Sequence, residues 1–422
     1  MAKSLTRRNT LSVYLVALAG NIAFSVENQY YNVFLYNEIA PVPLYVSLMV
    51  MITAFVSTIT AIIMGAFSDV KGKRRSFMLY GFIFWAFTTA MFPFAAFVRP
   101  VIMAVITAIL FDSIMSFFGA TAYDAALKAY VIDITTLDNR GKAVGIIEIM
   151  TLLATLIVYG VSGLIVAAIN YYNYFILIGL LTGIIGITGS LLVEESEDLM
   201  PLTINTWKHL KSTFNLDNLK GNKDCFLVLL GIGLWAIGFQ IYFPFILIYL
   251  EHYVGLELLM ASLVVFIALM VSILLGIPIG ILIDKVGRKK IAIIAVLLQS
   301  ISLILFSYSF EIITLIITGI LWVLFMSMFH ISSQTWANDL YPKEKAGQFS
   351  GYFLIFNVLI GMLLGPFIGN LIADQWGSPI IIDGIPGLVP PPLIFFIAAF
   401  VILFSIIPII KAKEFRHIKE TQ

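Results

Sequence analysis

The chain has 422 residues, of which 60% are hydrophobic and 12% are charged, and its formal net charge is +1. Soluble chains average about 45–50% apolar and about 25% charged residues, so this composition excludes an ordinary soluble enzyme, a disordered protein and a nucleic-acid-binding protein. The single cysteine, Cys225, excludes an internal disulfide and a metal site built from several cysteines.

Twelve long apolar runs follow one another along the chain. A helix needs about 20 mostly apolar residues to cross a bilayer, and continuous rather than alternating runs favour helices over a β-barrel. The first run is too long for a cleavable signal peptide, so we expect it to be retained. The expected spans are 11–36, 44–68, 76–98, 101–128, 143–167, 171–193, 225–250, 258–283, 291–310, 312–336, 349–373 and 391–410.

The distribution of basic residues predicts how these spans are oriented. With twelve spans, all 25 Lys and Arg residues except Arg99 fall on one side of the membrane. Loops rich in Lys and Arg stay in the cytoplasm. We therefore expect an all-α, multi-pass protein of the plasma membrane with both termini cytoplasmic.

The longest polar stretch between spans follows the sixth span and predicts the division of the chain. We expect a first six-helix half, a cytoplasmic linker, a second six-helix half and a cytoplasmic tail. Their predicted bounds are 1–193, 194–224, 225–410 and 411–422.

An internal repeat supports this division. The spacing Gly-x3-Asp-x2-Gly-basic-basic occurs after the second span and again after the eighth, and a second motif recurs after the fourth and tenth spans. Parallel repeats of this kind are related by a pseudo-two-fold axis along the membrane normal and place substrate between them. The second motif pairs Asp133, Gly141 and Gly145 with Asp339, Gly347 and Gly351.

The first motif has a physical rationale as a gate on the cytoplasmic face. A glycine allows close helix approach, a carboxylate at a helix end can receive backbone N–H groups or a helix dipole, and basic residues hold the loop at the surface. We expect Asp69 and Asp284 to form a latch that closes this face, while Lys71, Lys73, Arg75 and Lys290 only set the topology. The predicted gating residues are Gly65, Asp69, Gly72, Arg74, Gly280, Asp284, Gly287 and Arg288.

With these motifs the chain resembles the major facilitator superfamily over essentially its whole length. The resemblance implies a carrier that works by alternating access. Asp339-Leu-Tyr-Pro342 with the following Gly347 and Gly351, and Gly365-Pro366, are similar to sugar-type symporters, nearest to the glycoside–pentoside–hexuronide and sucrose-transporter-like branches. The sugar-porter signature after the sixth span and the glycine-proline antiporter signature of the fifth span are absent.

Polar side chains inside the spans are candidate site residues, because a charge at membrane depth costs several kcal/mol unless a partner or water stabilises it. Asp112 is expected near the midplane, and Glu27 in the outer half of the first span. A desolvated carboxylate can carry a proton, so we expect at least one of them to be the coupling group. Alternatively, Glu27 lies in a water-filled vestibule and Asp112 bonds to a neighbouring Asn or Tyr. The predicted substrate and proton site consists of Asn21, Glu27, Asn28, Asp112, Gln240, His330 and Asn357.

Other polar and aromatic positions have weaker interpretations. His330 is either a proton relay or a neutral hydrogen-bonding residue, and Asp124 and Lys128 are expected to pair because they are four residues apart on a helix. Glu148 reaches the cytoplasmic gate or has only an interfacial role. Aromatic residues that could stack on a sugar ring are Tyr30, Tyr31, Tyr159, Trp235 and Trp322.

The function predicted from these features is proton-coupled symport of a neutral polar solute, such as a sugar or glycoside. No Gly-x4-Gly-Lys-Ser/Thr loop is present, so ATP is not expected to be the energy source. We also expect no cofactor and no metal site. The main alternative is a proton-coupled efflux antiporter of lipophilic or cationic compounds, and a membrane enzyme and a lipid flippase are more distant ones. We expect a monomer, because one chain contains both halves, and a structured outer loop at 374–392.

Overall fold

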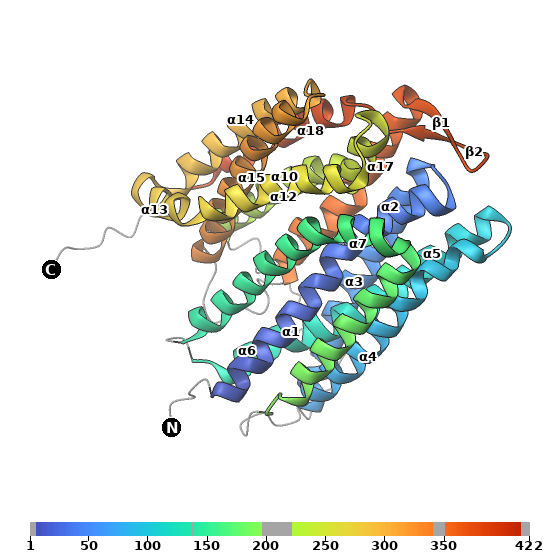
Figure 1. Cartoon of the computed structure of the whole chain (residues 1–422). Coiled ribbons are helices and arrows are strands. Elements are labelled where there is room, and N and C mark those ends of the chain that lie inside the picture. Colours follow the sequence, from blue (N-terminus) through green and yellow to red (C-terminus); the bar gives the residue numbers. More distant parts are fainter. Residues whose placement is uncertain (1–5, 137–138, 196–221, 341–350, 415–422) are drawn as a thin grey trace.

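The apolar runs form helices in the computed structural model. The structure describes residues 6–136, 139–195, 222–340 and 351–414, and only the backbone of residues 140, 141, 277 and 284 (Figure 1). Most of the predicted linker and tail lies outside these residues. The first half contains α1 (Arg7–Val26), η1 (Glu27–Tyr31), α2 (Asn32–Phe34), η2 (Leu35–Ile39), α3 (Pro43–Lys71), α4 (Arg75–Met91), η3 (Phe92–Phe97), α5 (Val101–Gly119), η4 (Ala120–Leu127), α6 (Lys128–Ile134) and α7 (Arg140–Leu191).

The second half repeats this helical plan and adds one short hairpin. Its elements are α10 (Lys223–Tyr242), η5 (Phe243–Phe245), α11 (Ile246–Ile248), η6 (Tyr249–Tyr253), α12 (Leu258–Leu274), α13 (Gly276–Val286), α14 (Arg288–Ser307), α15 (Ile312–Leu340), η8 (Ile355–Leu359), α17 (Ile360–Trp376), β1 (Ser378–Ile382), β2 (Ile385–Val389), α18 (Leu393–Leu403) and α19 (Ile406–Lys411).

The described residues account for all twelve predicted spans. Ten helical stretches are long and apolar enough to cross a membrane. One of them, α7, supplies two spans because Asn170 has a left-handed backbone (φ 64°, ψ 170°) and its side chain accepts the backbone N–H of Asn173 at 3.1 Å, as an N-cap does. α12 and α13 together form the remaining span.

Large apolar side chains on the outside of the bundle are directed away from the protein. Ile313 is 72% exposed and Leu274 is 70% exposed, and many Leu, Ile and Phe residues of other helices are similarly uncovered. Such a surface would aggregate in water but is satisfied by lipid chains. The exposed apolar belt therefore agrees with the membrane class predicted from composition.

The two halves pack mainly within themselves and meet along two helix pairs. In the first half α7 packs against α1 and α4, and in the second half α10 packs against α17 and α18. Between the halves, α3 contacts α17 and α12 contacts α7. Figure 1 shows the halves as two bundles, blue to green and yellow to red, which converge toward the hairpin and diverge toward the two termini.

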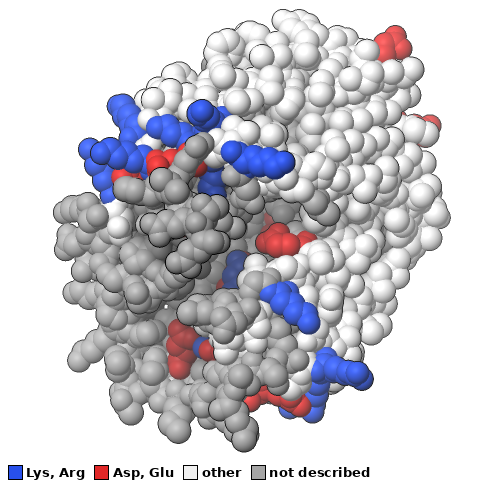
Figure 2. All heavy atoms as spheres, turned by 90° about the vertical axis from the view of Figure 1, so that its left-hand side faces the viewer, with Lys and Arg blue, Asp and Glu red and all other residues white. Residues whose placement is uncertain are grey.

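The two ends of the molecule differ, and we name them by their contents. The basic end carries the first turn of α1 and the loops 71–75 and 285–290, whereas the hairpin end carries β1 and β2 (Figure 1). Figure 2 views the basic end and shows a recess between two groups of basic side chains.

The predicted outer loop is a two-stranded antiparallel sheet. Ser378 pairs with Val389 at its base and Ile382 with Ile385 at its tip. Asp383 and Gly384 make the turn with φ values of 50° and 78°. An Asp-Gly pair with two positive φ angles is typical of a two-residue hairpin turn, so the local sequence explains the hairpin.

Candidate functional site

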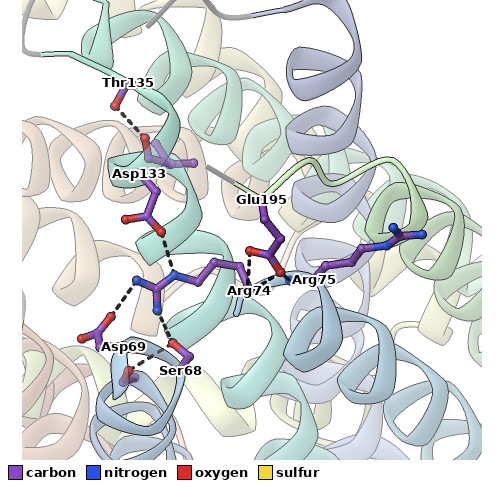
Figure 3. A network of polar contacts seen from close by, with 9 residues as sticks. Ser68, Asp69, Arg74, Arg75, Asp133, Thr135 and Glu195 are labelled. Carbon is purple, nitrogen blue, oxygen red and sulfur yellow. Dashed lines mark hydrogen bonds and ion pairs between the residues drawn. The ribbon is translucent and has the colours of Figure 1, made fainter. Parts of the chain in front are cut away.

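Arg74 is the centre of a charged network at the basic end of the first half (Figure 3). α3 ends at Gly72, whose left-handed backbone (φ 58°) turns the chain back toward α4. The Arg74 guanidinium is buried and pairs with Asp69 at 2.7 Å and with Asp133 of α6 at 2.7 Å, and it also donates to Ser68. The predicted latch residue Asp69 is thus tied to an arginine of its own half.

The charge state of Arg74 follows from these contacts. Burial lowers the pKa of its guanidinium, but the hydrogen bond and charge of Asp133 and the charge of Asp69 raise that pKa by more. The net shift is upward, so the side chain stays positively charged at any physiological pH.

Glu195 completes the network from the end of α7. Its carboxylate accepts the backbone N–H of Arg74 at 2.9 and 3.0 Å and that of Arg75 at 2.9 Å. These N–H groups are at the start of α4 and have no intrahelical partner, so Glu195 caps this helix and neutralises its positive end. Sequence reasoning missed this residue, although it assigned such a capping role to a carboxylate in general.

The second half contains the same arrangement. Arg288 forms an ion pair with Asp339, and its backbone N–H donates to Glu414 at 2.6 Å. Lys289 donates to the carbonyl oxygens of Ile410 at 2.6 Å and Ala412 at 2.8 Å, near the end of α19. We call Arg74, Asp133 and Glu195 the first clamp, and Arg288, Asp339 and Glu414 the second clamp.

The other glycines of the predicted gating motif have different structural roles. The close helix approach expected at Gly65 and Gly280 is wrong for this conformation, because no described atom lies within 4 Å of where a Cβ would stand at either position. Gly287 does have a positive φ of 104° that favours glycine. The side chain of Asp284 lies outside the described part of the chain, as does Gly347 of the second repeated motif.

Two carboxyl groups meet inside the first half. Glu27 in η1 accepts a hydrogen bond from Ser116 of α5 at 2.5 Å, and Asp112, one turn earlier on α5, is 2% exposed. The carboxyl groups of Glu27 and Asp112 interact directly with each other. Their Oε2 and Oδ1 atoms are buried and have no protein donor among the described residues. The ion pairs of the described residues do not include either carboxylate.

Several candidate residues lie where a helix widens into a π-helical segment. Glu27 and Asn28 lie in η1, and Asn357 lies in η8. Further π-helical segments are η2 in the first span, η4 in the fourth and η6 in the seventh. Such segments are rare and occur frequently at functional sites, because they break the regular hydrogen-bond ladder.

The remaining candidates are distributed over both halves. Asn21 donates to the Tyr123 hydroxyl at 2.8 Å and links α1 to η4, whereas Asn28 donates to Phe24 of its own helix. Gln240 is buried against Gly365, and its Oε1 has no described donor. The His330 ring lies 6.1 Å from the Trp235 ring. The described contacts do not bring His330 and Asn357 to the Glu27–Asp112 pair.

The secondary interpretations have mixed outcomes. The predicted Asp124–Lys128 pair is confirmed at 2.7 Å, and Glu148 is exposed. The aromatic residues considered for sugar stacking are all buried, so protein atoms cover their faces in this conformation. Those residues are Tyr30, Tyr31, Tyr159, Trp235 and Trp322.

Twelve apolar spans in two similar halves, with a clamp repeated in each, define a membrane carrier of the duplicated six-helix class. The family model of the major facilitator superfamily matches residues 13–271 and 228–420. The chain therefore belongs to the major facilitator superfamily, and it is a transport protein rather than an enzyme.

Individual relatives are distant. An uncharacterized MFS-type transporter of Methanocaldococcus jannaschii is 26% identical over 103 residues, which cover 24% of this chain and 26% of that protein. Among solved structures, the xylose transporter XylE from E. coli in an inward open conformation has a TM-score of 0.72 at 14% identity and covers 97% of each chain. The nucleoside transporter NupG has a TM-score of 0.67 at 14% identity, covering 97% of this chain and 100% of NupG. A D-xylose-proton symporter gives 0.69 at 15% identity, covering 95% and 97%.

Proposed function

We propose that the chain is a proton-coupled symporter of a neutral polar solute, such as a sugar or a glycoside, and that it works by alternating access. The observation that carries this proposal is the pair of neighbouring carboxyl groups of Glu27 and Asp112, whose buried Oε2 and Oδ1 atoms have no donor among the described residues. Carboxylates at membrane depth mark proton and ion pathways. Burying a charged group in the membrane costs free energy, so such a residue is a candidate for a functional role.

The pair offers a direct coupling chemistry. One shared proton leaves the two carboxyl groups with a single negative charge, whereas losing it leaves two like charges in contact. The deprotonated pair is stable only where water reaches it, so deprotonation favours an open conformation and protonation favours a sealed one. A proton gradient can therefore bias the cycle in one direction.

The unfilled hydrogen-bond acceptors between the helices favour a solute that carries hydroxyl groups. Gln29, Asn32 and Gln240 each have a buried amide oxygen with no donor among the described residues. Such acceptors are costly when unpaired and are satisfied by hydroxyl donors of a bound solute. The D-xylose-proton symporter and the nucleoside transporter NupG, which have similar folds, support this substrate class.

The membrane arrangement belongs to the same proposal. We assign the basic end and both termini to the cytoplasm, because basic loops are retained there. The protein is then a monomer of the plasma membrane in which the candidate site Asn21, Glu27, Asn28, Asp112, Gln240, His330 and Asn357 lies between the halves. The proposed units are 1–193, the linker 194–224, 225–410 and the tail 411–422.

Uptake into proteoliposomes with an imposed pH gradient tests this function. A panel of labelled sugars and cationic dyes would be compared for the wild type, Glu27→Gln and Asp112→Asn. We expect gradient-driven accumulation of a sugar that either substitution abolishes. Glu311→Gln is the matched control, because Glu311 is an exposed carboxylate at the start of α15.

Two other outcomes would contradict the proposal. Sugar accumulation that is unchanged in both variants would separate transport from the carboxyl pair. Dye that leaves the lumen against its gradient, without sugar uptake, would instead assign the chain to the proton-coupled efflux antiporters.

A further inference from the structure

The hairpin of the second half grips the first half. The backbone N–H of Leu388 in β2 donates to the Pro41 carbonyl at 3.0 Å, and the Tyr36 hydroxyl donates to the Leu388 carbonyl at 2.8 Å. Both backbone groups of Leu388 are therefore bound by the first half, one by η2 at the end of the first span and one by the turn that follows it.

Close packing reinforces these two hydrogen bonds. A Cβ built on Gly387 would lie 1.8 Å from the Pro41 carbonyl oxygen, so only glycine lets the strand approach this closely. Beside this contact, Asn37 donates to Glu251 at 3.1 Å and is bonded to His252 at 2.7 Å. The hairpin thus extends a seal that already joins helices of the two halves.

The hairpin is attached to the second half by the chain itself. It is connected to α17 through Gly377, whose backbone N–H donates to Ala373 at 2.8 Å, and β2 contacts α17 and η6 of its own half as well as α3 of the first half. When the halves separate at this end, the contacts of the hairpin with its own half can persist. The contacts with Tyr36 and Pro41 cannot.

We infer that the β1–β2 hairpin is a strap that holds the hairpin end closed, and that its release from Tyr36 and Pro41 is a required step when this end opens. The strap consists of Gly387 and Leu388 on one half and Tyr36 and Pro41 on the other. It contains no charged group, so it is weak enough to break and re-form in every cycle.

Cysteine labelling tests the strap without any substrate. Ser262 of α12 is fully buried and bonded to the Tyr30 hydroxyl at 2.8 Å, between the halves. In a Ser262→Cys variant, a membrane-impermeant maleimide added at the hairpin end reacts only when this end opens. The native Cys225 is 2% exposed, and its labelling in a parallel reaction in detergent, where the reagent reaches both ends, is read by mass spectrometry and reports any unfolding.

Two independent changes should release the strap. Tyr36→Phe removes one hydrogen bond and should speed labelling of Ser262→Cys about five-fold. Gly387→Ala should also speed labelling, because its methyl group cannot fit beside Pro41. Tyr80→Phe, at an exposed tyrosine of α4, is the control and should leave the rate unchanged.

The inference is overturned if both variants label at the control rate while Cys225 stays protected. It rests on the proposed alternating-access cycle, but not on proton coupling or on a sugar substrate. A failure to transport every sugar in the panel would therefore be distinguishable from a failure of the strap.

Discussion

The basic end and the hairpin end are held together by different chemistry. At the basic end, the described clamps use charged side chains, which range from the buried Arg74 to the exposed Glu195 and Asp339, and each clamp stays within one half. At the hairpin end, the contacts between the halves are mostly neutral hydrogen bonds, such as Tyr36 to Leu388 and Ser47 to Pro366. Hydrogen bonds to charged groups contribute about 1.5–3 kcal/mol and neutral ones about 0.5–1.5 kcal/mol.

The difference in strength between these contacts suits a carrier whose two halves move against each other. Strong contacts inside each half make it a rigid unit, and weak contacts between the halves can be exchanged at low cost. A carrier that rocks two units against each other needs this division of strengths. The next three predictions test it, from the largest expected effect to the smallest.

Locking the hairpin end should have the largest effect on transport. Cysteines at Pro41 and Leu388, oxidised to a disulfide, should reduce uptake more than ten-fold, because the end can no longer open. Dithiothreitol should restore uptake. A linked protein that still transports at the normal rate would show that this end does not need to separate.

Breaking the first clamp should have the largest effect on stability. Arg74→Ala leaves Asp69 and Asp133 without their buried cation, and we expect a loss of about 3 kcal/mol in the free energy of unfolding. Thermal unfolding in detergent would measure this loss. Arg75→Ala, at the neighbouring exposed arginine, should cost less than about 0.5 kcal/mol. Equal losses for the two variants would contradict the role given to the clamp.

The two helix caps should contribute smaller and similar amounts. Glu195→Gln and Glu414→Gln each weaken the capping of one helix, α4 or α14, and each should cost about 0.5–1 kcal/mol. The same thermal unfolding assay would compare them. A marked difference between the two variants would mean that the repeated geometry does not have repeated energetics.

The sequence predicted the spans well, because a bilayer forces each one to be a long apolar run. It also predicted the position of the basic loops and the repeat that leads to Arg74 and Arg288. Counting along each helix predicts the depth of Glu27 and Asp112 in the membrane, and this depth stays a prediction. Their closeness to each other could not be predicted in this way, because counting gives a position along a helix but not which way a side chain faces.

Other features had no usable signal in the chain. Glu195 and Glu414 bind backbone N–H groups more than 100 residues away. Every residue except proline has such a group, so the sequence does not show which of them a carboxylate binds. The hairpin turn had a local signal, the pair Asp383-Gly384, but the attachment of β2 to Pro41 depends on the approach of the two halves.

The turn at Asp383 and Gly384 also provides an experimental handle. Both residues are exposed at the tip of the hairpin, beyond the last paired residues of the strands. Exposed tips of this kind tolerate insertions. A short epitope inserted between them would add an antibody-binding site at the hairpin end of the protein. The same epitope, stained on intact cells, would report directly which side of the membrane this end occupies.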